Sequence, residues 1–149
     1  MGYRNVVVGT DGSVTAERAV REAARVAASF GARLTIVTAF SPNPAAEARA
    51  RAEAPEDVQW AVTDAASADE RAERGRAIAR ETGVQDVRIV TESGDPASAI
   101  LEATDSTGGD LIVVGSKGMA SPSRFVLGNV PNKVSHHAPC DVLIVHTVP

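Results

Sequence analysis

Residues 110–118 read Asp-Leu-Ile-Val-Val-Gly-Ser-Lys-Gly, and this stretch decides the fold class of the chain. Its apolar part, 111–114, is the most apolar run of the sequence. Unbroken apolar runs of this length are typical of strands buried on both faces of a parallel sheet. A similar run, Asn5-Val6-Val7-Val8-Gly9, lies near the N-terminus and also ends in glycine. The sequence therefore predicts two fully buried strands.

Helical patterns separate the predicted strands. From Ala16 to Phe30 small apolar side chains recur at helical spacing, and Gly31 provides a stop, because glycine tolerates the left-handed conformation that closes a helix. Residues 41–57 contain three prolines and little periodicity, which predicts a long irregular segment. The remaining predicted elements are strands at 34–39, 87–91 and 142–148, and helices at about 62–82, 96–103 and 130–138.

Strands that alternate with helices in this way predict an α/β fold: an open five-stranded parallel sheet with helices on both faces. We expect residues 1–149 to form one domain. In such sheets ligands bind beyond the carboxyl ends of the strands, where the winding direction reverses. Function is therefore expected in the turns that follow Gly9 and Gly115.

The composition excludes some classes of partner. Fifteen Lys plus Arg against nineteen Asp plus Glu give a net charge of −4, so the basic surface that nucleic acid requires is not expected. No apolar run reaches the roughly 18 residues of a membrane helix, and the N-terminus has no signal-peptide pattern. Cys140 is the only cysteine, which excludes an intrachain disulfide and favours the cytoplasm.

The segment after the strand at 111–115 has features of a phosphate site. Gly115 and Gly118 are expected to adopt positive φ and to let the backbone approach a ligand closely. A helix that begins near Asn129 would present unpaired N–H donors and a partial positive charge to an anion. Further donors could come from nearby polar and basic side chains: Ser116, Lys117, Ser121, Ser123 and Arg124.

The same segment carries a family pattern. Gly115-Ser116-Lys117-Gly118, nine further residues and then Gly128-Asn129-Val130 resemble the universal stress protein motif, with all three glycines at the expected spacing. The stretch 6–13 resembles the first signature of that family, and 142–145 resembles its last strand. The resemblance covers essentially the whole chain. It implies an adenine nucleotide alpha hydrolase-like fold with strand order 3-2-1-4-5.

The resemblance also implies a function: a regulatory module in the stress response that binds an adenine nucleotide, with ATP favoured and cyclic AMP as an option. Asp11 would bond a ribose hydroxyl or hold a magnesium ion, and main-chain groups at Thr10 and Ala39 would cradle adenine. The implied nucleotide-binding residues are Thr10, Asp11, Ala39, Val114, Gly115, Lys117, Gly118, Gly128, Asn129 and Val130. Asp11 has a second interpretation, as a turn former that bonds its own backbone.

Two positions depart from the family pattern. Asn129 stands where Ser or Thr is usual, and Asn remains a good helix N-cap with an amide that can bond phosphate. Pro131 stands where a second hydroxyl often follows, and it removes one N–H and one hydroxyl from the first turn. The loss of these two donors could weaken the binding of a β- or γ-phosphate, whereas a site for a single phosphate would not be affected.

Other chemistry is less favoured. His136, His137 and Cys140 do not make a four-ligand metal site, and Cys140 is expected to be a small buried residue. His146 is expected to be structural, within the last strand. The spacing excludes a P-loop, and no residue is placed to activate water, so we expect a binder with at most slow ATP hydrolysis.

The last strand, 142–148, is expected at a sheet edge, where unpaired backbone groups invite a partner. The resemblance implies a homodimer that pairs this strand with its copy. Two alternative functions are considered. One is a dimeric structural or interaction protein that binds no nucleotide, and the other is a weak ATP hydrolase.

Overall fold

The computed structural model describes residues 2–40, 64–116 and 129–147, so the irregular segment predicted at 41–57 lies outside the described part. The strands are β1 (Asn5–Gly9), β2 (Arg33–Phe40), β3 (Val87–Ser93), β4 (Leu111–Gly115) and β5 (Asp141–Val145). The described helices are α1 (Val14–Phe30), α3 (Asp64–Thr82), α4 (Pro96–Thr107) and α5 (Asn129–His137).

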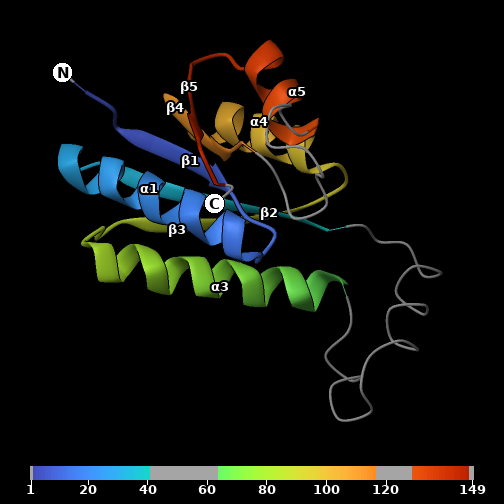
Figure 1. Cartoon of the computed structure of the whole chain (residues 1–149), viewed down its shortest axis with the longest axis horizontal. Coiled ribbons are helices and arrows are strands. Elements are labelled where there is room, and N and C mark those ends of the chain that lie inside the picture. The colour runs from blue at the N-terminus through green and yellow to red at the C-terminus, as the bar shows by residue number, and fades with distance from the viewer. Residues whose placement is uncertain (1, 41–63, 117–128, 148–149) are drawn as a thin grey trace, which may run out of the picture.

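The strands form one parallel sheet in the order β3-β2-β1-β4-β5, which confirms the implied topology. Helices α1 and α3 cover one face of the sheet, and α4 and α5 cover the other, which gives three layers (Figure 1). The winding reverses between β1 and β4, because the chain builds one side of the sheet from β1 through β3 and then crosses to β4.

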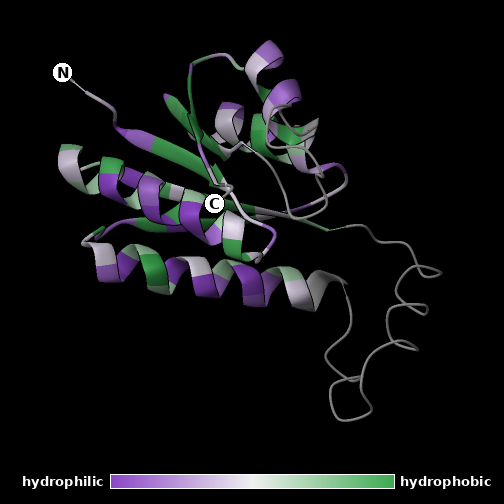
Figure 2. Cartoon of the chain, viewed as in Figure 1, coloured by the Kyte–Doolittle hydropathy of each residue, from purple (hydrophilic) through white to green (hydrophobic). Residues whose placement is uncertain are grey.

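The core has two parts, one on each face of the sheet. Alternate residues of the central strands point to opposite faces. Val6, Val8 and Val113 therefore pack against α1 and α3, whereas Val7 and Ile112 pack against α4 and α5. All five are fully buried. Figure 2 shows the same pattern, with hydrophobic strands between helices that carry their hydrophilic residues outside.

Local signals in the sequence set the ends of two helices. The Ser13 hydroxyl accepts a hydrogen bond from the Ala16 N–H at 3.1 Å, which caps the first turn of α1, and Gly31 closes this helix at φ 63°. At α4 the N-cap is Asp95, followed by Pro96 as predicted. This helix continues to Thr107, beyond the predicted end at 103, until Gly108 closes it at φ 71°.

The predicted last strand, 142–148, is too long. Strand β5 ends at Val145, which pairs with Gly115, the last residue of β4. His146 is exposed and lies outside the strand, so a structural role within the strand is wrong for it. The edge position of β5 is confirmed. Among the described residues, no helix is long and apolar enough to cross a membrane.

Candidate functional site

The carboxyl ends of β1 and β4 lie side by side, because these strands pair in parallel from Val6 with Leu111 to Val8 with Val113. The turn after β1 leads into α1 on one face of the sheet, while α4 enters β4 from the other face (Figure 1). The ends of these two strands therefore lie at the point where the winding reverses, which is where ligands bind in open α/β sheets.

Thr10 continues the sheet beyond β1. Its N–H donates to the Val37 carbonyl at 2.9 Å, and its Oγ1 accepts from the Gly12 N–H at 3.1 Å. Thr10 is buried, with 9% of its surface exposed. The main-chain donor of Thr10 is therefore engaged within the protein.

Asp11 is exposed and forms a turn with its own backbone. Its Oδ1 accepts a hydrogen bond from the Ser13 N–H at 2.9 Å. This contact fits the interpretation of Asp11 as a turn former. A carboxylate has two oxygens with about four acceptor positions, so one contact leaves room for another donor.

Strand β2 extends past the end of β1. The pairing of the two strands ends at Gly9 with Val37, whereas β2 runs on to Phe40. The main-chain N–H and C=O groups of residues two positions apart in a strand point to the same side. Those of Val37 point to β1, so those of Ala39 point to the space beyond the end of β1. Ala39 is half-buried. One donor and one acceptor of the main chain therefore stand at the edge of the sheet.

Arg71, which the sequence pattern does not single out, lies on α3 and reaches this edge. Its Nη2 donates to the Ala39 carbonyl at 3.2 Å. Its side chain also lies over Gly12, since a Cβ added to Gly12 would be 2.6 Å from both Cγ and Cδ of Arg71. Arg71 is one of several arginines in a polar helix, and nothing in the local pattern distinguishes it.

The expectation of positive φ at Gly115 is wrong. The glycines with positive φ in the described residues do not include Gly115. A Cβ at this position would be 2.9 Å from Cγ2 of Thr147, a fully buried side chain of the protein itself. Gly115 therefore makes room for the segment that follows β5.

Hydrogen bonds hold this segment against the end of β4. The Ser116 N–H donates to the Val145 carbonyl at 2.7 Å, and Ser116 Oγ accepts from the Thr147 N–H at 3.2 Å. Val114 is buried, with 3% of its surface exposed. Ser116 and the segment that follows β5 thus pack together at the end of β4.

The predicted phosphate loop lies mostly outside the described residues: Lys117, Gly118 and Gly128, with Ser121, Ser123 and Arg124. Helix α5 begins at Asn129, so the predicted helix start near 129 is confirmed. Val130 is half-buried and packs against the core beneath α4 and α5. Pro131 is buried in the first turn, where a missing N–H costs no intrahelical hydrogen bond.

The N-terminus of α4 is tied to α5 by Lys133. The Nζ of Lys133 donates to Asp95 Oδ2 at 3.0 Å and to Ser98 Oγ at 2.9 Å. The hydrogen bond from Lys133, aided by the Ser98 N–H, lowers the pKa of Asp95 below its usual value. This contact links α5, which follows the predicted phosphate loop, to α4, which precedes β4.

The alternative metal site finds no support in the part of the chain that the structure describes, where no group of three metal-ligating side chains occurs. His136 and His137 are exposed at the end of α5. Cys140 is half-buried, and its burial raises the pKa of the thiol, which disfavours the thiolate form that a nucleophile needs.

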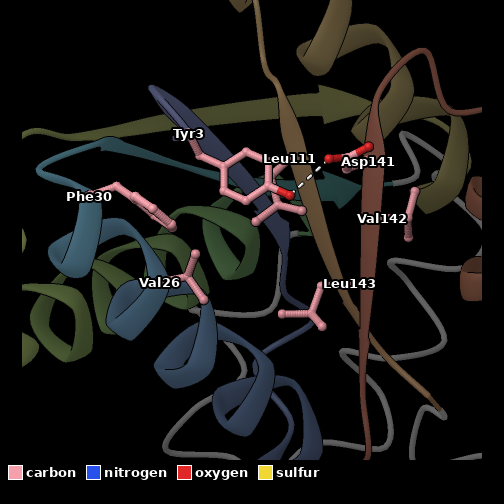
Figure 3. A pocket seen from close by; sticks show the side chains of 7 residues that line it. All are labelled: Tyr3, Val26, Phe30, Leu111, Asp141, Val142 and Leu143. Carbon is pink, nitrogen blue, oxygen red and sulfur yellow. Dashed lines mark hydrogen bonds between the residues drawn. The ribbon is translucent and has the colours of Figure 1, made fainter. Parts of the chain in front are cut away.

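A shallow groove of about 490 Å³ lies between α1 and β5, at the amino-terminal edge of the sheet (Figure 3). The Tyr3 hydroxyl donates to Asp141 Oδ2 at 2.8 Å, and the Tyr3 ring meets Phe30 edge-on at 5.5 Å. Leu143 points into the groove from the exposed edge strand. The groove is at the opposite edge from the candidate site.

The fold places the chain in the class of three-layer α/β proteins with an open parallel sheet and polar turns at its carboxyl edge. The model of the Universal stress protein family matches residues 2–146. The chain therefore belongs to the universal stress protein family.

Individual relatives agree with this assignment. Universal stress protein Rv1636 of Mycobacterium tuberculosis is 39% identical over 145 residues, which cover 97% of each chain. A universal stress protein solved in complex with cAMP is 33% identical, with a TM-score of 0.73 over 99% of this chain and 100% of that one. The universal stress protein UspA of Lactobacillus plantarum is 26% identical, with a TM-score of 0.78 over 97% of this chain and 99% of that one.

Proposed function

We propose that this protein binds an adenine nucleotide at the carboxyl edge of its sheet and acts as a regulatory module, not as an enzyme. The observation that carries the proposal is the end of β2, where Ala39 presents a main-chain donor and acceptor beyond the last residue of β1. The similar protein solved with cAMP supports the choice of ligand.

The proposed pose places the base at Ala39. The Watson–Crick edge of adenine offers an amino donor beside a ring-nitrogen acceptor, which complements one N–H and one C=O of a strand. Asp11 lies in the next turn, and its second carboxylate oxygen would accept from a ribose hydroxyl. The phosphate would then lie next to the N-terminus of α5, at Asn129 and Val130, and its proposed contacts in the preceding segment are Lys117, Gly118 and Gly128.

Within this proposal, a single phosphate is favoured over a triphosphate. Pro131 contributes no N–H and no hydroxyl to the first turn of α5, so fewer donors are available for β- and γ-phosphates. Cyclic AMP or AMP is therefore the preferred ligand. ATP, with a magnesium ion held by Asp11, is the alternative.

We further propose that the protein is one domain that works in the cytoplasm as a two-fold dimer. Strand β5 is an edge strand, and its Leu143 and Ile144 are 39% and 36% exposed. These two side chains lie on opposite faces of the strand, so pairing of β5 with its copy would cover both. The single cysteine supports a reducing compartment.

Two measurements test the nucleotide site. Mass spectrometry of the small molecules released from the purified protein would identify any co-purified nucleotide. Calorimetric titration with cyclic AMP, AMP, ADP and ATP would then rank them, and we expect the monophosphates to bind most tightly. Absence of binding by all four at millimolar concentration would refute the site and favour a dimeric interaction protein.

A further inference from the structure

Arg71 is placed at the carboxyl edge by packing that leaves it little freedom. Helix α3 lies against β2, where the Thr38 hydroxyl donates to the Ala68 carbonyl at 3.3 Å, one turn before Arg71. The aliphatic part of Arg71 covers Gly12, whose φ of 80° brings the backbone close. The guanidinium therefore ends at Ala39, next to the turn after β1.

The guanidinium is poorly satisfied in this position. Its Nε is buried and has no hydrogen-bond partner. Within the described part of the chain, every ion pair is made by other basic residues, so no carboxylate there pairs with Arg71. A buried donor without a partner is destabilising, and a charged one more so.

The one described hydrogen bond of this guanidinium goes to the acceptor that the proposed nucleotide would use. An adenine at the end of β2 would donate its amino group to the Ala39 carbonyl, which already accepts from Arg71 Nη2 at 3.2 Å. We propose that Arg71 is a specificity-determining residue that competes with the base amino group for the Ala39 carbonyl. This inference rests on the nucleotide site proposed above.

The competition depends on the chemistry of the base. A purine with an amino group at C6 must share the Ala39 carbonyl with the Arg71 donor or displace it, and either outcome lowers its affinity. A purine with a carbonyl at C6 does not need the Ala39 carbonyl and can accept from the guanidinium instead. Arg71 therefore reduces the preference for adenine over hypoxanthine, and the phosphate takes no part in this effect.

The test compares AMP and IMP on the parent protein and on Arg71→Met. Methionine keeps an unbranched apolar chain over Gly12 and removes the guanidinium donors. We expect AMP to bind about 5-fold more tightly to the variant, the effect of one net hydrogen bond. IMP is expected to bind no more tightly, so the ratio of the two affinities rises. Adenosine should gain by the same factor as AMP.

Arg74→Met is the matched control, because Arg74 lies on the same helix, is 67% exposed and faces Glu17 at 3.5 Å. It should leave the ratio of AMP to IMP unchanged. If Arg71→Met does not fold, Arg71→Leu carries the same test with a shorter side chain that has no donor, and the ratio should again rise.

Three results overturn the inference. An unchanged ratio of AMP to IMP in a parent protein that binds AMP refutes the role of Arg71 and leaves the nucleotide site intact. Weaker binding of both nucleotides to Arg71→Met, with adenosine unaffected, would mean that the guanidinium binds phosphate. Absence of AMP and IMP binding by the parent protein refutes the nucleotide site itself, and the inference with it.

Discussion

Gly115→Ala tests whether Gly115 makes room for the protein itself. The added Cβ would be 2.9 Å from Thr147 Cγ2 and 3.2 Å from Thr147 Oγ1. Thr147 is fully buried, and its N–H donates to Ser116 Oγ, so it has little freedom to move away. Overpacking by one methyl group in such a place costs about 1–3 kcal/mol. We expect the free energy of unfolding to fall by about that amount.

The assay is urea unfolding of four proteins: the parent, Gly115→Ala, Thr147→Ser and the double variant. Thr147→Ser removes Cγ2, the atom of closest contact, and keeps the hydroxyl. The double variant should therefore lose at least about 0.5 kcal/mol less than the sum of the two single changes, as residues in contact do. Additive losses, or a Gly115→Ala protein as stable as the parent, would refute this account of Gly115.

Three other predictions concern the candidate site and the edge strand. Asp11→Asn keeps the side-chain oxygen that accepts from the Ser13 N–H, so the melting temperature should not change. The nucleotide affinity should fall several-fold, because the charge of the carboxylate is lost. An unchanged affinity would mean that Asp11 acts only as a turn former. Ile144→Glu should give a monomer by light scattering, whereas Val14→Glu, at a remote position that is 71% exposed, should not; a monomeric parent would refute the dimer. Lys133→Met should raise the pKa of Asp95 toward its usual value in an NMR titration.

The sign of the Lys133 effect follows from linkage. The contact lowers the pKa of Asp95 in the folded state, so its stabilisation is present above the unfolded value of about 3.9 and is lost as the pH falls through the folded pKa. Both partners are about half exposed, so the contribution is below about 1 kcal/mol. A stability difference that persists at pH 2 would contradict this explanation.

The sequence was sufficient to predict the strands, the helices around them and the edge at which function is expected. Buried parallel strands read as continuous apolar runs, and the helices that cover them repeat at 3.6 residues, so both signals are local. Ser13, Gly31 and Asp95 set helix ends through contacts within a few residues. The strands and helices depend on short stretches of chain, and the structure confirms them, whereas function at that edge stays a prediction.

Only the tertiary structure decided which side chains lie at that edge. Arg71 meets Ala39 and Gly12, residues 32 and 59 positions earlier, because α3 packs beside β2 and β2 runs past β1. Thr147 reaches Gly115 because β5 pairs with β4 and ends beside it. The hydropathy of the sequence indicates whether a residue is buried, but it does not indicate which residues surround it. Contacts of this kind depend on strand order, register and helix placement, which become fixed only when the distant elements pack together.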